Sequence, residues 1–251
     1  MIRAFHTEVQ KARRRHDLLI CLMMPVIIIL WAGGLRDTSS PEELASGYSS
    51  LFYSIPVINS LVLPVFMAVL ASRLWDMEIK GSTWKLLYTL QSRRSLFIGK
   101  VWFGVTEVLL VTVTEMAAVR LLGNIQAYTE KFPIRQFLYL SVCTLTVDLM
   151  LFFLELLIML MTKNPLPALC VGIVGALLGL FSAFLPPIVS YFVPSGYFIP
   201  LGAYIVADWE EATHTVTYGT RPFNWGLLAF TLVLGIGFFC VAWHSAQNQE
   251  V

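Results

Sequence analysis

Long runs of apolar residues alternate with short polar segments along the whole chain. A helix needs about 20 apolar residues to cross the hydrocarbon core of a bilayer, and these runs are close to that length. Their apolar residues are continuous and do not alternate with a period of two, which favours helices over the strands of a barrel. We predict six transmembrane helices, over residues 18–35, 51–72, 97–120, 136–161, 166–185 and 223–243.

The first apolar run is expected to remain in the protein as a transmembrane helix. It extends from Leu18 to Leu35, which is longer than the roughly 7–15 residues of a signal-peptide core. No small-x-small cleavage site stands clearly after it. The run is therefore interpreted as the first span and not as a cleaved leader.

A further apolar segment, residues 188–206, has two interpretations. It is long enough to be a seventh span, which would place the C-terminus outside the cell. However, Pro194, Gly196, Pro200 and Gly202 interrupt it every few residues, and a straight spanning helix tolerates such breaks only where neighbours satisfy the freed carbonyls. We favour two short re-entrant helices within an extracellular loop over 186–221, which continues as a polar stretch before the last span.

Composition restricts the class of protein. Of the 251 residues, 57% are hydrophobic and only 13% are charged, whereas a soluble domain carries about 25% charged residues. A water-soluble fold would have too little charge to cover its surface, which excludes soluble enzymes, nucleic-acid-binding proteins and disordered regulators. The net charge of +1 likewise indicates no nucleic-acid partner. We expect a single all-α polytopic transmembrane domain over residues 1–251.

The basic residues are distributed unevenly between the two sides of the six predicted spans. Twelve of the 17 lysines and arginines fall on the side of the N-terminus, mainly in residues 1–17 and 73–100. Cytoplasmic loops carry such an excess. We therefore predict that the N- and C-termini are both cytoplasmic.

The cysteines have no Cys-x-x-Cys spacing and lie inside apolar runs, so we interpret them as small buried hydrophobic residues. They are Cys21, Cys143, Cys170 and Cys240. We expect neither a disulfide framework nor a metal site, and no cofactor bound by this chain.

Two polar segments are expected on the cytoplasmic side. Residues 1–17 combine a basic face with Ile2, Phe5 and Val9 on another face, which is typical of an interfacial amphipathic helix. A simpler alternative is a basic anchor with no further role. In the second segment, Gly81 ends a helix and Ser82 is a good N-cap for a short one.

This short helix, predicted over residues 82–90, carries an apolar stripe. Trp84, Leu87 and Tyr88 stand at helical spacing. Such a cluster often marks a contact surface for another protein. Packing of the stripe on the inner leaflet explains the same pattern, and periodicity alone leaves both interpretations open.

Several sequence motifs resemble those of ABC-2-type permeases. The first cytoplasmic loop of that family has an acidic residue, a small polar break, Trp-Lys-Leu-Leu, an arginine, and Gly-Lys at the start of the third span. This chain has Glu78 to Leu87, Arg93-Arg94 and Gly99-Lys100. Its Glu8-Val9-Gln10-Lys11 is similar to the family's N-terminal elbow helix. The nearest branch is the lantibiotic-immunity and bacitracin-type permeases, although Gln91-Ser92 replaces the Pro-Val of many relatives.

The resemblance implies a mechanism and partners. In that family the helix at 82–90 is a coupling helix, which docks into a groove of a separate ATPase present in two copies. Its expected docking residues are Thr83, Trp84, Lys85, Leu87 and Tyr88. It further implies a bacterial cytoplasmic membrane, a second permease chain (a heterodimer is favoured) and an amphipathic antimicrobial peptide as substrate.

The chain is not expected to be an enzyme. It contains no G-x-x-x-x-G-K-[ST] phosphate loop, since Gly99-Lys100-Val101 lacks the hydroxyl residue and the upstream glycine. ATP and Mg²⁺ would then be held by the partner ATPase. An intramembrane protease is disfavoured, because Glu210-Glu211 is followed by Thr215 where an arginine is needed.

Four carboxylates fall inside predicted spans, where an ionised group costs about 2.5–3.5 kcal/mol. They are Glu107, Glu115, Asp148 and Glu155. They are candidates for a transport pathway for a cationic substrate, and Asp148 with Glu155, two turns apart on one helical face, is the favoured pair. The alternative is that they bind hydroxyl groups of neighbouring helices.

Other classes of transporter stay open at this stage. Buried carboxylates could relay protons in an ion-coupled secondary transporter, although no matched pair of broken helices is evident. An ABC-2 exporter of a different hydrophobic substrate is a further alternative. Gly172, Gly175 and Gly179 form a small-residue face, interpreted as packing within the chain rather than between two chains.

Overall fold

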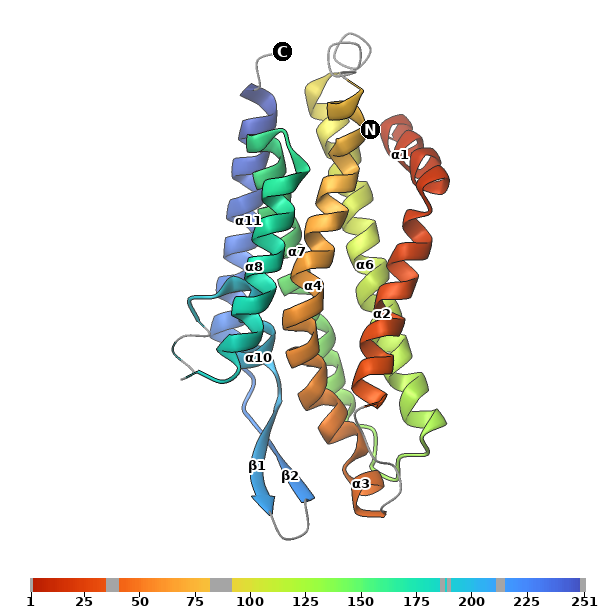
Figure 1. Ribbon diagram of the computed structural model, residues 1–251, viewed down its shortest axis with the longest axis vertical. Helices are drawn as coiled ribbons and strands as arrows, with labels where there is room; N and C mark the ends of the chain where they lie inside the picture. The colour runs from red at the N-terminus through yellow and green to blue at the C-terminus, as the bar shows by residue number, and fades with distance from the viewer. Residues whose placement is uncertain are drawn as a thin grey trace.

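Six long helices run side by side in the computed structural model of this protein (Figure 1). The structure describes residues 2–34, 41–81, 92–185, 188, 191–210 and 215–248. In this part of the chain, six helices are long and apolar enough to cross a membrane, which confirms the six predicted spans. They are α2 (Asp17–Gly34), α4 (Gly47–Lys80), α6 (Arg93–Ile125), α7 (Ile134–Thr162), α8 (Pro165–Ser182) and α11 (Trp225–Asn248).

The bundle has two distinct ends. Both chain termini lie at one end, together with α1 (Ile2–Arg15), which is the predicted N-terminal helix (Figure 1). We call this the termini end. At the opposite end lie the short helix α3 (Pro41–Ala45) and an antiparallel hairpin (Figure 1), and we call it the hairpin end. The coupling helix predicted over 82–90 lies outside the described residues.

The two longest helices extend well past the apolar runs that predicted them. Helix α6 has 33 residues, which at 1.5 Å per residue is about 50 Å. Its basic residues Lys100 and Arg120 are 20 positions apart, so about 30 Å of helix separates them, which equals the hydrocarbon thickness of a bilayer. The apolar run therefore marks the depth of the membrane and not the ends of the helix.

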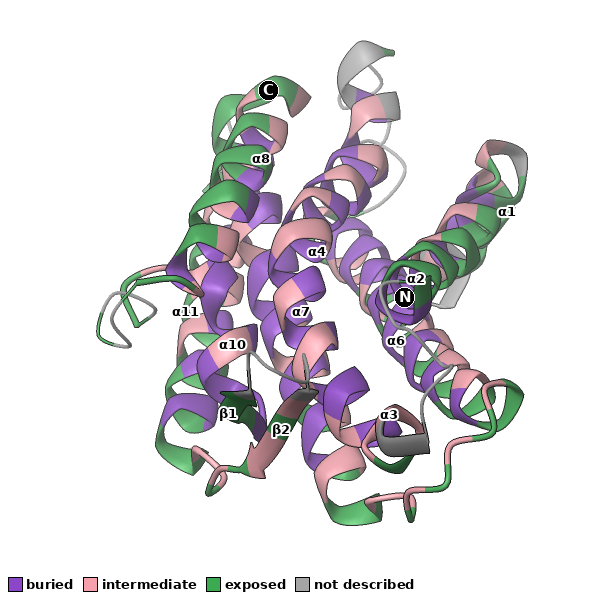
Figure 2. Cartoon of the chain, turned by 60° about the horizontal axis from the view of Figure 1, so that its bottom comes forward, coloured by how far each residue is buried: buried purple, intermediate pink, exposed green. Residues whose placement is uncertain are grey.

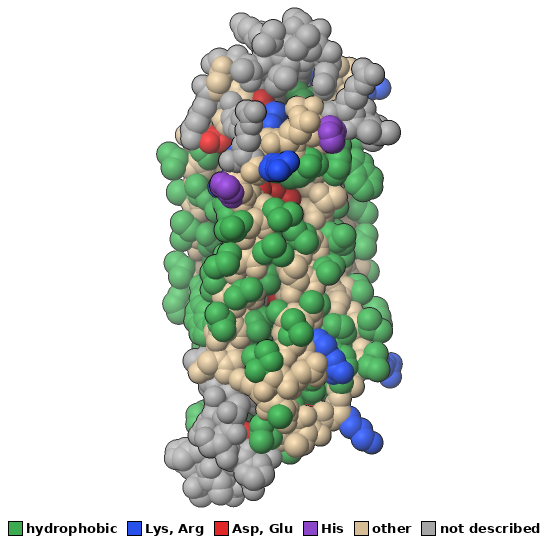
Figure 3. Space-filling view, turned by 90° about the vertical axis from the view of Figure 1, so that its right-hand side faces the viewer, with side chains coloured by type: hydrophobic (Ala, Val, Ile, Leu, Met, Phe, Trp, Pro, Cys, Tyr) green, Lys and Arg blue, Asp and Glu red, His purple; other side chains and the backbone are tan. Residues whose placement is uncertain are grey.

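Helix α4 lies at the centre of the bundle and packs against α2, α6, α7 and α8. Buried residues gather on α4, α6 and α7, whereas α8 and α11 carry exposed residues on their outer faces (Figure 2). On the face shown in Figure 3, hydrophobic side chains cover the middle of the molecule, histidines lie near the termini end, and basic side chains lie towards both ends. Cys170 and Cys240 are exposed on these outer faces, so only Cys21 and Cys143 are buried as expected.

Small residues allow α8 to approach α4 closely. A Cβ atom added at Gly172 would lie 2.7 Å from the Cβ of Ala68 and 3.0 Å from the carbonyl oxygen of Pro64. One added at Gly179 would lie 2.9 Å from the carbonyl oxygen of Ser60. Real Cβ atoms do not approach so closely. The small-residue face of this helix therefore serves packing within the chain, as the sequence predicted.

We expect Gly172→Val to separate α8 from α4 and to lower the melting temperature of the detergent-purified protein. Overpacking of this kind costs about 1–3 kcal/mol, and the obstacle includes backbone that cannot rotate away. Gly237→Val is the matched control, since a Cβ there meets nothing within 4 Å. Equal melting temperatures for the two variants would contradict the role assigned to Gly172.

The segment before the last span contains two short helical turns, η1 (Pro194–Gly196) and α10 (Phe198–Leu201). They pack against α4, α7 and α8, and Tyr197, Phe198 and Leu201 are buried there. In the described residues of 188–206 there is no seventh spanning helix. Two short helical turns are thus present in this loop, and their re-entrant, extracellular position stays a prediction.

The rest of that loop, which was predicted only as a polar stretch, contains a β-hairpin. Strands β1 (Tyr204–Glu210) and β2 (Thr215–Thr220) pair antiparallel, with a bulge between Val206 and Asp208. Aromatic and β-branched residues favour strands. Both strands contain such residues, but the polar residues between them made the segment resemble a loop. Arg221 fixes the base of the hairpin, because its guanidinium donates to the carbonyl oxygens of Ile199 and Gly202 at 2.8 and 2.7 Å.

Candidate functional site

Four charged side chains from three helices meet at the termini end. We call Glu8 and Lys11 of α1, Glu78 of α4 and Lys100 of α6 the charge cluster. Oε1 of Glu78 lies 2.7 Å from Nζ of Lys11 and 2.8 Å from Nζ of Lys100. Oε1 of Glu8 lies 2.7 and 3.3 Å from the same two nitrogens. Each carboxylate thus contacts both ammonium groups.

Three of the four members of the cluster are almost closed to solvent. Glu8, Glu78 and Lys100 are 2%, 3% and 0% exposed. Burying an unpaired charge is very costly, whereas two carboxylates facing two ammonium groups offset much of this cost. Lys100 also donates to the carbonyl oxygen of Leu74 and lies 5.1 Å from the ring centroid of Trp75. The ammonium of Lys100 is therefore surrounded by two carboxylates, a carbonyl oxygen and an aromatic ring.

The pKa directions of Lys11 and Glu78 agree with ionised partners. Burial alone lowers the pKa of Lys11, but the carboxylates of Glu78 and Glu8 outweigh it and raise this pKa above its ordinary value. Burial raises the pKa of Glu78, but the nearby Lys100 and Lys11 outweigh it and lower this pKa. Both groups are thereby stabilised in their charged forms.

A second set of ion pairs fixes the joint between α1 and α2. His16 adopts a left-handed conformation with φ of 56°, which turns the chain sharply between the two helices. Across this joint, Arg15 Nη2 of α1 lies 2.9 Å from Asp17 Oδ2 of α2. Arg73 of α4 donates from Nε to Asp17 Oδ1 at 2.7 Å and from Nη2 to the carbonyl oxygen of Arg15 at 2.7 Å. The joint is therefore anchored to α4.

Together these contacts join α1 to both helices that flank the predicted coupling helix. Helix α4 ends at Lys80 and α6 begins at Arg93, so the predicted coupling helix lies between them in the chain. The start of α6 is also tied to the end of α11, because Arg93 Nη1 donates to the carbonyl oxygen of Gln247 at 3.0 Å. A displacement of the 82–90 segment would act on a unit of α1, α4 and α6.

The expected docking residues themselves are not described by the structure. Thr83, Trp84, Lys85, Leu87 and Tyr88 all lie within 82–91. Their assignment to an ATPase contact stays a prediction. The charge cluster was missed by sequence reasoning, although Glu78 and Lys100 were part of the motif that resembles ABC-2 permeases, and their pairing gives that motif a physical basis.

Two of the membrane-embedded carboxylates bind polar groups on neighbouring helices. Asn59 Nδ2 of α4 donates to Glu115 Oε1 at 2.7 Å, and Thr112 Oγ1 donates to Asp148 Oδ2 at 3.2 Å. Both carboxylates are 0% exposed, and they are close enough to interact electrostatically. These contacts favour the alternative in which the carboxylates hold helices together. Asn59, an amide inside an apolar span, was the sequence signal for a partner.

The favoured pair of Asp148 and Glu155 is not joined by a hydrogen bond in the part of the chain that the structure describes. Asp148 accepts its hydrogen bond from Thr112 of α6. Oε2 of Glu155 is buried and has no hydrogen-bond partner among the described residues. Glu107 instead lies within electrostatic reach of Asp17, Arg15 and Arg73 at the α1–α2 joint. The four carboxylates thus form no single site, and their role in transport stays a prediction.

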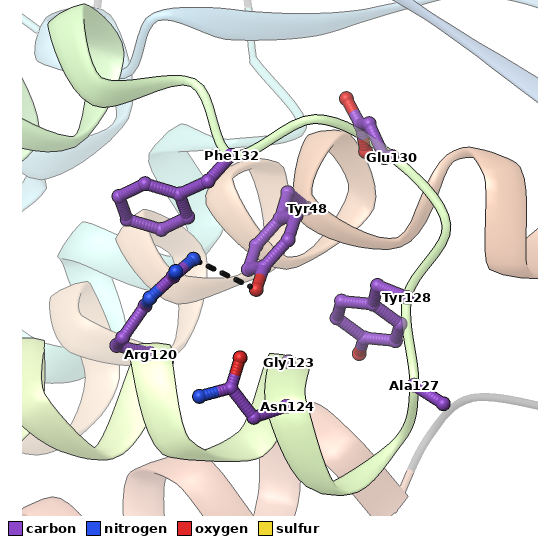
Figure 4. A pocket seen from close by; sticks show the side chains of 8 residues that line it. All are labelled: Tyr48, Arg120, Gly123, Asn124, Ala127, Tyr128, Glu130 and Phe132. Atoms are coloured by element: carbon purple, nitrogen blue, oxygen red, sulfur yellow. Dashed lines mark hydrogen bonds between the residues drawn. The ribbon is translucent and has the colours of Figure 1, made fainter.

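Two cavities lie on the side of α6 towards the hairpin end. One is polar, about 350 Å³, and is lined by residues of α4, α6 and the connection that follows α6 (Figure 4). The other is an apolar groove of about 390 Å³ between α6 and α7. Arg120 lines both, whereas none of the four carboxylates lines either.

The arrangement is that of a multi-pass membrane protein: six apolar helices enclose a core, and charged contacts unite three helices at one end. The family model for ABC-2 family transporter proteins matches residues 4–179. The chain belongs to this family. No curated protein matches it.

Family membership establishes the general role of the chain. It is the membrane permease of an ABC transporter, and the family implies an ABC ATPase as partner. Permeases of this kind are membrane transport components and are generally non-catalytic. The matched residues include the charge cluster, the 82–90 segment, and the helices from α1 into α8.

Proposed function

We propose that this chain is the permease subunit of an ABC exporter that removes an amphipathic, lantibiotic-like antimicrobial peptide from the membrane and releases it outside the cell. The observation that carries the coupled mechanism is the charge cluster, which joins α1 to the two helices that flank the 82–90 segment. The peptide substrate is supported by the resemblance to lantibiotic-immunity permeases. Another hydrophobic substrate is the alternative.

We place the termini end in the cytoplasm of a bacterial cell, with the protein in the cytoplasmic membrane. The excess of basic residues on that side supports this orientation. Both termini and the charge cluster lie at the same end (Figure 1), so an ATPase in the cytoplasm would face them. The hairpin of β1 and β2 is then extracellular.

In the proposed mechanism, energy comes from two copies of the partner ATPase, which hold ATP and Mg²⁺. Their closure moves the coupling helix at 82–90. Because Glu78 and Lys100 are paired with each other and with α1, α1, α4 and α6 move as one unit. Helix α6 carries Glu107 and Glu115, which are pathway candidates together with Asp148 and Glu155. A second permease chain, different in sequence, completes the transporter.

Reconstitution tests this function. The chain is purified with its ATPase and second permease and placed in liposomes with a fluorescent cationic amphipathic peptide. We expect ATP to drive movement of the peptide, with no effect from a protonophore. Transport that follows a proton gradient without ATP would instead identify an ion-coupled secondary transporter. ATP-driven movement of a neutral hydrophobic probe, but not of the peptide, would favour the alternative substrate.

A further inference from the structure

The polar cavity and the apolar groove meet at one basic side chain. Arg120 extends from α6 into the polar cavity, where Nη1 donates to the hydroxyl of Tyr48 at 3.3 Å and the guanidinium lies 4.2 Å from the ring centroid of Phe132 (Figure 4). Asn124, one turn further along α6, points into the same space (Figure 4). Arg120 also lines the apolar groove, and among its α6 residues it is the last in the chain.

The groove has the length of one membrane leaflet. On α6 it extends from Leu109 to Arg120, and these two residues are separated by about 16 Å of helix. Half of the hydrocarbon core is about 15 Å thick. Leu109, Val113 and Val142 on its walls are 48%, 56% and 51% exposed, so the groove opens sideways towards the lipid. An extended acyl chain fits this shape and chemistry.

Arg120 stands at the depth of the lipid headgroups. Since about 30 Å of α6 separates it from Lys100, the two residues lie near the opposite boundaries of the hydrocarbon core. Among the residues that the structure describes, no carboxylate forms an ion pair with Arg120. The acidic residue in the lining of the polar cavity is Glu130. Its carboxylate accepts hydrogen bonds from Ser49, from the backbone N–H at 2.9 Å and from the hydroxyl.

We propose that this combined site binds a phospholipid of the bilayer, with one acyl chain in the α6–α7 groove and the phosphate on Arg120. A guanidinium presents several donors in a plane and suits a phosphate group. Tyr48 and Asn124 offer further polar contacts beside it. The site lies at the end of the molecule opposite the charge cluster, and the inference goes beyond the proposed function because it depends on neither the ATPase nor the exported substrate.

Binding of dioleoyl phosphatidylglycerol to the detergent-purified protein, followed by native mass spectrometry, tests the site. We expect Arg120→Gln to weaken binding about tenfold, because the variant loses the charge-assisted hydrogen bonds to the phosphate. Arg120→Lys is expected to retain part of the affinity. Arg135→Gln is the control, because Arg135 is a second exposed arginine of the hairpin end that lines neither cavity.

A second pair of variants tests the acyl chain without altering Arg120. Val113→Trp fills the groove and is expected to reduce lipid binding. Val174→Trp on α8 is the control and is expected to leave lipid binding unchanged. The two valines are matched in exposure, at 56% and 55%. Equal binding by Val113→Trp and Val174→Trp would overturn the proposal. So would equal affinity of Arg120→Gln and the unchanged protein, or displacement of the lipid by inorganic phosphate at millimolar concentration, which would indicate a simple anion site.

Discussion

Replacement of Lys100 by methionine is expected to destabilise this protein by about 3–5 kcal/mol, the usual cost of breaking a buried ion pair from one side. Lys100 is fully buried and lies against Glu78 and Glu8. Without it, two carboxylates face only the ammonium of Lys11. The loss should appear as a large fall in melting temperature and in the yield of folded protein.

A double variant separates loss of charge balance from loss of packing. Adding Glu78→Gln to Lys100→Met leaves Glu8 paired with Lys11, one negative and one positive charge. We expect the double variant to recover part of the stability, which a merely steric effect of methionine would not allow. Lys131→Met is the control, since Lys131 is exposed in the connection after α6. If Lys100→Met is as stable as Lys131→Met, the cluster has no structural role.

The second large effect is expected from the double substitution Trp84→Ala with Tyr88→Ala. If these aromatic side chains dock the ATPase, their removal abolishes peptide transport and co-purification of the ATPase, while membrane insertion and the stability of the permease stay unchanged. Loss of a central aromatic anchor typically costs 2 kcal/mol or more, about thirtyfold or greater in affinity.

The control for this experiment is Trp209→Ala. Trp209 is 64% exposed on β1 at the hairpin end, so its loss should leave ATPase association intact. Full transport by the Trp84→Ala/Tyr88→Ala variant would show that docking occurs elsewhere. The two sets of variants are expected to have different effects. The charge-cluster variants lower the stability of the permease, whereas the docking variant lowers only its coupling to the ATPase.

Hydrophobic pattern predicted the helices well because a bilayer imposes a long, continuous signal. All six spans were identified, but α4 and α6 extend beyond the predicted 51–72 and 97–120. Their polar ends are held by protein contacts, which leave no hydropathy signal. The β1–β2 hairpin was missed for a related reason: two strands of seven and six residues outside the membrane are specified by weak local preferences and by tertiary support from Arg221.

The candidate site was only partly accessible from the sequence. The motif containing Glu78 and Lys100 was identified, but the structure was needed to pair these residues with each other and with Glu8. Helical spacing favoured Asp148 with Glu155 on the face they share. The structure instead links Asp148 to Thr112 of α6, because partners on other helices depend on how the helices pack and not on spacing along one of them.

The sequence by itself determined that this protein lives in a membrane, crosses it with six helices and belongs with ABC-2 permeases. These properties follow from local composition and motifs, since the cost of exposing polar backbone to lipid acts on each segment separately. Only the tertiary structure decided which charges neutralise one another, where α8 contacts α4, and that Arg120 joins a polar cavity to an apolar groove. Such features arise from residues far apart in the chain, whose approach is set by the packing of whole helices.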